Sequence, residues 1–229
     1  NMIRPSYGFS ALLSPGERFI ERYVKQCSKI IIPDNPPPYT ISEYNLGNLD
    51  DMGLENKVEY VGSFIDTTPV SGKQEHVFVP ISGPIGTRAK ILRMLLPILE
   101  KANTKYVISL GAPGKKVSKK IGNNEVHTWL STEERKKALV NAKYVIFSGG
   151  HATCFETIKY GKPSICIPTQ PEQLANAAKL EKLHCSIVVK NRKQIEKALL
   201  KLEREIDIYY RHMQVLRKVS SSLKGLDRA

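Results

Sequence analysis

The sequence predicts an α/β fold: a doubly wound parallel sheet with helices on both faces, preceded by the tail of another domain. From about residue 76 onward, short runs rich in Val and Ile alternate with stretches of helical periodicity. These runs are apolar on both faces, as expected of parallel strands buried between helices. They are EHVFVPIS, TKYVISLG, EVHTWL, AKYVIFSG, PSICIPT and HCSIVV.

Start and stop signals delimit the helices expected between these runs. Ser131 precedes Glu134 by three residues, which is the spacing of a capping box. Asn191 is placed to cap a helix that carries one apolar stripe on a lysine-rich surface. Gly161 followed by Pro163 is a common helix stop. Strands that alternate with delimited helices support the doubly wound sheet.

The pattern divides the chain into three segments. Residues 1–65 contain a helix, one or two strands and a proline-rich loop, which is too little for an independent domain, so we interpret them as the end of an N-terminal domain and a linker. Residues 66–203 form the α/β domain. Residues 204–229 form a basic helix that we expect to pack back on the N-terminal domain. Because residue 1 is not Met, we expect a truncated fragment or one half of a split enzyme.

The composition is that of a basic globular protein. Of the 229 residues, 41% are apolar and 25% charged, with a formal net charge of +13. This charge suits a nucleic acid, an anionic membrane surface or a multiply charged small ligand. Aromatic residues make up only 7% and are not interleaved with the lysines, so nucleic acid is the least favoured partner.

Targeting signals and metal motifs are not evident in the sequence. No run approaches the roughly 18 apolar residues of a membrane span, and the first residues lack the pattern of a signal peptide. The four cysteines include no C-x-x-C pair, so we expect reduced thiols in a cytoplasmic protein and no metal site.

Three loops follow strands at the sheet edge where ligands bind in such folds. In the first, Gly83 and Gly86 let the backbone approach a ligand, and the helix that starts near Thr87 points free N–H groups outward. A phosphate would suit this loop, although a simple helix-start turn explains it equally well. The second loop, SGGHATCFETIKYGKP at 148–163, again offers backbone amides to an anion near Thr153.

The remaining candidate side chains are polar groups that follow two strands. Glu156 falls in the first turn or so of its helix, where the helix dipole stabilises an acid. The same position suits a carboxylate that accepts the two hydroxyls of a ribose, and the residues alone do not decide. In the third loop, IPTQPEQLANAA, the side chains of Glu172, Gln173 and Asn176 suit sugar hydroxyls, but polar helix starts are common too.

Taken in order, these motifs resemble those of a known family. The segment from Val77 to about Leu202 resembles the C-terminal, donor-binding domain of GT-B glycosyltransferases, most closely the MurG-like enzymes of glycosyltransferase family 28. That pattern has a glycine loop, an aromatic–apolar pair before a helix, S/G-G-x-x-T-x-x-E…G-x-P, and P…Q-x-x-N-A. The four elements here are SGPIG at 82–86, Trp129-Leu130, GGHATCFETIKYGKP at 149–163 and IPTQPEQLANA at 167–177.

The resemblance implies a binding site for a UDP-sugar. Glu156 would hold the ribose hydroxyls, and the main chain of Leu130 would read the edge of the uracil. The implied diphosphate contacts are Gly83, Gly86, Gly149, Gly150, His151, Ala152 and Thr153, and the implied sugar contacts are Glu172, Gln173 and Asn176. The resemblance implies no cofactor and no metal, because this fold uses helix dipoles and amides where other transferases use a divalent cation.

The implied activity is inverting transfer of N-acetylglucosamine or a related hexose from a UDP-sugar to an acceptor, which in related enzymes is often lipid-linked. The general base is expected in the missing N-terminal part, so no catalytic residue is named. We expect a cytoplasmic location at the inner face of the cell membrane, because the surplus of Lys and Arg, including the helix at 204–223, fits anionic lipid.

Two other functions use the same architecture and stay open. One is an enzyme like the UDP-N-acetylglucosamine 2-epimerases, and the other is a non-catalytic nucleotide-sugar-binding subunit that needs a partner chain. The sequence also departs from the family pattern. Pro84 and Ile85 stand where small polar residues are usual, and His151 stands where a small residue is usual, so that its side chain is either a phosphate contact or a surface histidine.

Overall fold

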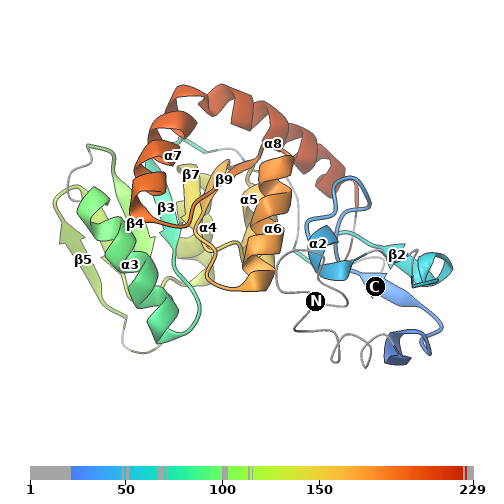
Figure 1. Ribbon diagram of the computed structural model, residues 1–229. Helices are drawn as coiled ribbons and strands as arrows, with labels where there is room; N and C mark the ends of the chain where they lie inside the picture. Colours follow the sequence, from blue (N-terminus) through green and yellow to red (C-terminus); the bar gives the residue numbers. More distant parts are fainter. Residues whose placement is uncertain are drawn as a thin grey trace.

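The computed structural model describes residues 22–223 and 225, apart from residues 48, 50–51, 66–69, 71, 100–102, 113 and 115. Within this part of the chain, a seven-stranded sheet follows a smaller two-stranded one (Figure 1). The strand order of the large sheet is β5-β6-β4-β3-β7-β8-β9. Its strands are β3 His76–Pro80, β4 Tyr106–Ser109, β5 Ser118–Ile121, β6 Asn124–His127, β7 Ala142–Phe147, β8 Ser164–Cys166 and β9 Ser186–Val188.

All neighbouring strands of this sheet are parallel except β5, which pairs antiparallel with β6. The mostly parallel sheet confirms the predicted α/β fold, and each predicted apolar run contributes a strand. The hairpin strand β5 was not predicted. All four of its residues are exposed, and two are Lys, so it shows none of the apolar pattern that marks a buried strand.

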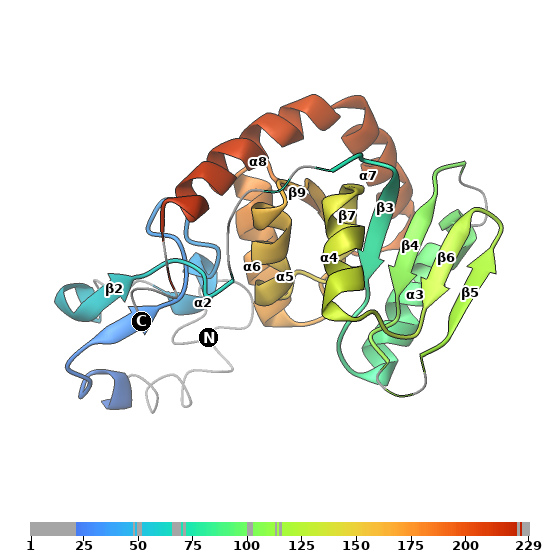
Figure 2. The ribbon, with the colours of Figure 1, turned by 180° about the vertical axis from the view of Figure 1, so that it is seen from behind.

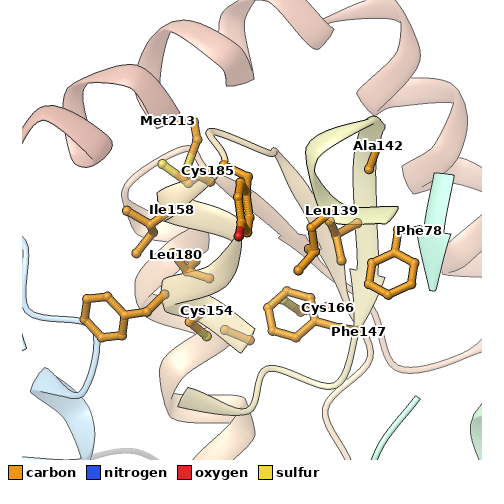
Figure 3. Close-up of a cluster of buried hydrophobic side chains, with 14 of the residues drawn as sticks. Phe78, Leu139, Ala142, Phe147, Cys154, Ile158, Cys166, Leu180, Cys185 and Met213 are labelled. Atoms are coloured by element: carbon orange, nitrogen blue, oxygen red, sulfur yellow. The ribbon is translucent and has the colours of Figure 1, made fainter. Parts of the chain in front are cut away.

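Helices cover both faces of the sheet. α3 (Ile85–Leu99) and α7 (Arg192–Arg204) pack on one face, and α4 (Thr132–Val140), α5 (His151–Lys159) and α6 (Pro171–Lys182) pack on the other (Figure 2). The alternation of side chains along β3 divides the core accordingly: Val77 and Val79 face α3 and α7, and Phe78 faces α4 and α5. Figure 3 shows side chains of the core cluster that faces α4, α5 and α6. This cluster also contains three buried cysteines, Cys154, Cys166 and Cys185.

The helix signals in the sequence are confirmed. Ser131 and Glu134 form a reciprocal capping box at the start of α4. The Asn191 side chain caps α7 by accepting from the amide of Gln194. α5 ends at Lys159, and Gly161 follows with a φ of 62°.

The two-stranded sheet consists of β1 (Ile30–Ile32) and β2 (Val58–Tyr60), joined in parallel. Between them lie the short helix α2 (Glu43–Leu46) and a 3-10 turn, η1 (Glu55–Lys57). This unit has a small core of its own, formed by Ile32, Leu46, Leu49, Met52 and Leu54.

Two sets of contacts connect the small unit to the large sheet. α2 packs on α6, where Glu43 forms an ion pair with Lys179 and Asn45 donates to the Asn176 side chain at 2.8 Å. α8 (Ile206–Ser221) runs back across the molecule toward β1 and β2 (Figures 1 and 2). Near its end the Ser220 hydroxyl donates to the Asn35 side chain at 3.0 Å. No helix in the described part of the chain combines the length and apolar character that crossing a membrane requires.

Candidate functional site

The glycine loop after β7 is held against α6. Gly149 has a φ of 89°, and a Cβ at this position would lie 2.5 Å from the carbonyl oxygen of Gln173. Only glycine therefore fits here without moving α6. Gly150 is the N-cap of α5, which begins at His151, so the first amides of α5 lie at the carboxyl edge of the sheet. An anion at this edge would meet free N–H groups and the positive end of the helix dipole.

Glu156 does not lie in the first turn of α5, and the expectation that it does is wrong. α5 begins at His151, and its first turn contains no acidic residue. The effect of the helix dipole falls off beyond that turn, so it gives no sufficient reason for an acid at this position. A different neighbour holds the carboxylate.

That neighbour is Arg135, on α4. Its Nε donates to Glu156 Oε1 at 2.8 Å, and one of its terminal nitrogens, Nη2, donates to Glu156 Oε2. The same Nη2 lies 3.3 Å from the hydroxyl of Thr153. The guanidinium also lies over the ring of Phe78, 5.8 Å from its centroid. Two-pronged pairing of this kind fixes the direction of a carboxylate as well as its charge.

His151 points from the start of α5 toward the small unit. Its Nε2 lies 3.4 Å from Oδ2 of Asp34, which follows β1. Asp34 is fully buried and also accepts from the amides of Asn35, Ile41 and Ser42. The Asp34 carboxylate therefore stabilises the loop after β1 and also contacts the first residue of α5. A cavity of about 190 Å³ lies beside this pair, with an otherwise mostly apolar lining contributed by Ile30, Ile31, Ile32, Pro33, Ser42 and Leu46.

The polar residues of α6 differ in their surroundings. Asn176 is fully buried, and its amide nitrogen donates to the carbonyl of Gly149 at 3.1 Å. It supports the glycine loop from behind and offers a ligand no surface. Gln173 is nearly buried and accepts from the amide and hydroxyl of Thr169. Glu172 is partly exposed and accepts from Asn176 at 3.2 Å.

The first loop follows β3, which is the sheet neighbour of β7, so it lies beside the glycine loop. α3 starts at Ile85, two residues before the expected start at Thr87, and Gly86 lies inside its first turn. Gly83 has a φ of 100°, and Ile85 is 76% exposed. The Arg88 side chain donates to the carbonyls of Leu110 and Gly111, so it braces the loop after β4.

Leu130 lies between β6 and α4. Its side chain is buried in the core, while that of its neighbour Trp129 is 46% exposed. Only the main chain of Leu130 is therefore available to a ligand at this edge. Ala152 is exposed in the first turn of α5.

Two residues of this region, Arg135 and Asp34, were missed by the sequence reasoning. Arg135 stands in the charged run EERKK, which is typical of a solvated helix surface. Asp34 directly follows the strand KIIIP, so its place at the carboxyl end of a strand was a usable signal. Within the described residues, no group of three or more His, Cys, Asp or Glu side chains is arranged to hold a metal ion.

Comparison with known proteins gives the family. A family model described as the glycosyltransferase family 28 C-terminal domain matches residues 91–224, which is more than half of the chain. Uncharacterized glycosyltransferases of Methanosarcina acetivorans and Methanosarcina mazei are each 29% identical to the chain over 174 residues. The match covers 72% of this chain but 45% of each relative, so the chain spans about half the length of the curated relatives it matches.

Solved structures with a similar fold are GT-B glycosyltransferases. The glycotransferase of kitacinnamycin matches with a TM-score of 0.69 at 13% identity, over 98% of this chain and 66% of that one. The calicheamicin glycosyltransferase CalG4 matches with a TM-score of 0.65 at 15% identity, over 96% and 57%. The spinosyn rhamnosyltransferase SpnG, complexed with thymidine diphosphate, matches with a TM-score of 0.62 at 15% identity, over 87% and 55%. At these identities the likeness shows the GT-B fold.

Proposed function

Because the chain belongs to the glycosyltransferase family 28 C-terminal domain family, we propose that it is the donor-binding part of an inverting glycosyltransferase. The donor is a UDP-sugar, and the transferred sugar is N-acetylglucosamine or a related hexose. The observation that carries the proposal is the carboxylate of Glu156, held in one orientation beside an anion-binding helix start. The family match also favours a transferase over a 2-epimerase.

The diphosphate occupies the start of α5 in this proposal. The amides of Gly149, Gly150, His151 and Ala152 face it, and the first loop with Gly83 and Gly86 closes from the side of β3. These groups oppose the charge that develops on the diphosphate as the bond to the sugar breaks. Because they are held before the donor arrives, they need little rearrangement during the reaction.

The nucleoside lies between α4 and α5. Glu156 accepts the ribose hydroxyls, and the main chain of Leu130 reads the uracil edge. The donor sugar then extends toward α6, where Glu172 is partly exposed. Gln173, which accepts from Thr169, is the further side chain that we assign to the sugar, whereas the buried Asn176 acts through the glycine loop.

The acceptor side is assigned to the segment before residue 66 and to whatever precedes it. We propose that residues 1–65 end an acceptor-side domain, that 66–203 form the donor-binding domain, and that 204–229 return to the first. The contact of Ser220 with Asn35 supports this division. An inverting transfer also needs a general base for the acceptor hydroxyl, and we assign that base to the acceptor side.

A lipid-linked acceptor and peripheral attachment to an anionic membrane complete the proposal. The outward face of α8 supports it, because the exposed Arg211 and Lys218 alternate with Ile208, 44% exposed, and Val215, 51% exposed. Basic residues beside exposed apolar ones are typical of helices that lie on anionic lipid. Sedimentation with phosphatidylserine vesicles, with phosphatidylcholine vesicles as control, measures this attachment.

The donor site is tested by calorimetry with nucleotides. UDP should bind, and Glu156→Ala should weaken that binding by about tenfold or more, because each lost hydrogen bond to a charged group is worth about 1.5–3 kcal/mol. CMP and AMP should bind poorly to the unaltered protein. No effect of Glu156→Ala would refute the assignment of the ribose site. Equal affinity for all three nucleotides would refute the assigned uracil and diphosphate contacts, because the three carry the same ribose.

A further inference from the structure

We propose that Arg135 is the positioning residue of the donor site: it sets the Glu156 carboxylate for the ribose 2′-hydroxyl and so makes the site prefer a ribonucleoside diphosphate over its 2′-deoxy form. The inference rests on the proposed function and adds to it the origin of sugar discrimination in the nucleoside. Arg135 lies outside the glycine loops and the polar helix start from which the site was first identified.

Arg135 and Glu156 form a two-pronged ion pair. Nε and Nη2 of Arg135 each engage a different oxygen of Glu156, so the guanidinium and the carboxylate meet edge to edge. An ionised carboxylate offers about four lone-pair sites, and this fork uses the convergent one on each oxygen. The remaining site on each oxygen points outward, so either oxygen can still accept one hydroxyl, such as the 2′-hydroxyl of a ribose.

The Arg135–Glu156 pair is partly withdrawn from water. The side chains of Arg135 and Glu156 are only 30% and 21% exposed, so both charges have lost much of their water. Surface ion pairs are held loosely, but here the Arg135 side chain is confined by the Phe78 ring and the Thr153 hydroxyl. A lysine could supply the charge without the fork, and it would not fix the plane of the carboxylate.

The position of Glu156 on α5 leaves its charge in need of a partner. Glu156 lies beyond the first turn, so the helix dipole does little to hold its charge there. Arg135 provides the missing partner and connects two elements of the site. It stands five residues after Leu130 on the segment assigned to the base, and it contacts Thr153 and Glu156 on the segment assigned to the phosphate and ribose. The fork therefore ties the two nucleoside-binding segments together.

The test measures the affinities of the full chain for UDP and for 2′-deoxy-UDP by calorimetry. The unaltered protein should prefer UDP by about tenfold or more. Arg135→Met should reduce this preference to less than about threefold, mainly by weakening UDP, and Arg135→Lys should fall between the two. In a Glu156→Gln background, Arg135→Met should have no further effect on the preference.

The matched control is Arg192→Met, which removes an exposed Arg–Glu pair on α7 and should leave both affinities unchanged. The preference is a ratio measured within one variant, so partial unfolding of Arg135→Met does not imitate the expected result. An equal loss of affinity for both nucleotides, an unchanged preference, or tighter UDP binding by Arg135→Met would overturn the inference. If UDP fails to bind the unaltered protein, or if Glu156→Gln binds both nucleotides normally, the proposed function fails instead.

Discussion

At the carboxyl edge of the sheet, single residues are restrained by residues that are distant in the sequence but close in space. Gly149 is constrained by the carbonyl of Gln173 on α6, and Glu156 by the guanidinium of Arg135 on α4. In each case the restraining group belongs to a different element from the residue that it restrains. A change at Gln173 or Arg135 should therefore affect nucleotide binding through the residue that it restrains.

Gly149→Ala tests the first of these constraints. The added Cβ would lie 2.5 Å from the Gln173 carbonyl oxygen, at a φ of 89° that disfavours alanine. We expect a loss of about 1–3 kcal/mol in the free energy of unfolding, measured with urea, and a fall in UDP affinity of about tenfold. Gly122→Ala is the control, because Gly122 also has a positive φ, of 58°, but has open space around it. It should lose some stability and keep its UDP affinity, and equal losses of affinity in the two variants would contradict the prediction.

Among the elements, α4 runs from the carboxyl edge of the sheet, where the candidate site lies, to the opposite edge. Its first turn carries the capping box of Ser131 and Glu134, and the pKa of Glu134 is lowered to about 2 by Lys116 and by the Ser131 amide and hydroxyl. At its other end the carbonyl of Ala138 accepts from Nε2 of His76 at 2.9 Å. Since a carbonyl can only accept, the neutral His76 carries its proton on Nε2.

The burial of His76 predicts a pH dependence of stability. Burial lowers the pKa of His76 below its ordinary value of 6.5, with Lys105 acting in the same direction, while the hydrogen bond to Ala138 and the charges of Glu125 and Glu75 oppose it. The folded state therefore binds fewer protons here than the unfolded state. The stability associated with the neutral imidazole is present above pH 6.5 and is lost as the pH falls toward the folded-state pKa.

The measurement is the free energy of unfolding between pH 7.5 and pH 5 for the unaltered protein and His76→Gln. Glutamine keeps a side-chain donor for Ala138 but does not titrate in this range. We expect a shallower pH dependence in His76→Gln than in the unaltered protein. Parallel curves would show that other groups dominate the acid sensitivity.

An element can be predicted from the sequence only where its burial leaves a pattern of residues. Strands β3, β7 and β8 were predictable because burial on both faces leaves an apolar run. β5 was not, because an exposed edge strand needs no apolar residues. α3 was expected two residues too late, since Gly86 in its first turn carries no helix signal.

The candidate site was predictable only as far as local motifs reach. The position of Glu156 follows from its spacing after the glycine loop. Its pairing with Arg135 depends on α4 and α5 packing side by side, which the strand order sets and no local pattern encodes. The same holds for His151 and Asp34, which are 117 residues apart in the sequence.

At the scale of the whole molecule, contacts lead from the small unit to the glycine loop. Asn45 on α2 donates to Asn176, and Asn176 donates to the carbonyl of Gly149. One helical turn further along α6, Lys179 pairs with Glu43. The packing of α2 on α6 should therefore influence the position of the glycine loop, which we assign to the diphosphate.

The ion pair between Glu43 and Lys179 is the contact by which this connection can be tested. The Lys179 side chain is only 2% exposed, whereas that of Glu43 is 36% exposed. Glu43→Gln leaves a buried ammonium group without its counterion, which should cost about 1–3 kcal/mol, less than for a fully buried pair because water reaches Glu43. Lys179→Met leaves a carboxylate that water can solvate, so it should cost less.

Urea denaturation of the two single variants and the double variant Glu43→Gln/Lys179→Met gives the coupling between them. We expect Glu43→Gln to be the least stable of the three, and the double variant to recover part of the loss because it buries no unpaired charge. Limited proteolysis should cut Glu43→Gln fastest in the segment that holds α2, because that segment loses one of its contacts with α6. Equal stability of Glu43→Gln and the unaltered protein would show that the pair does not hold the small unit in place.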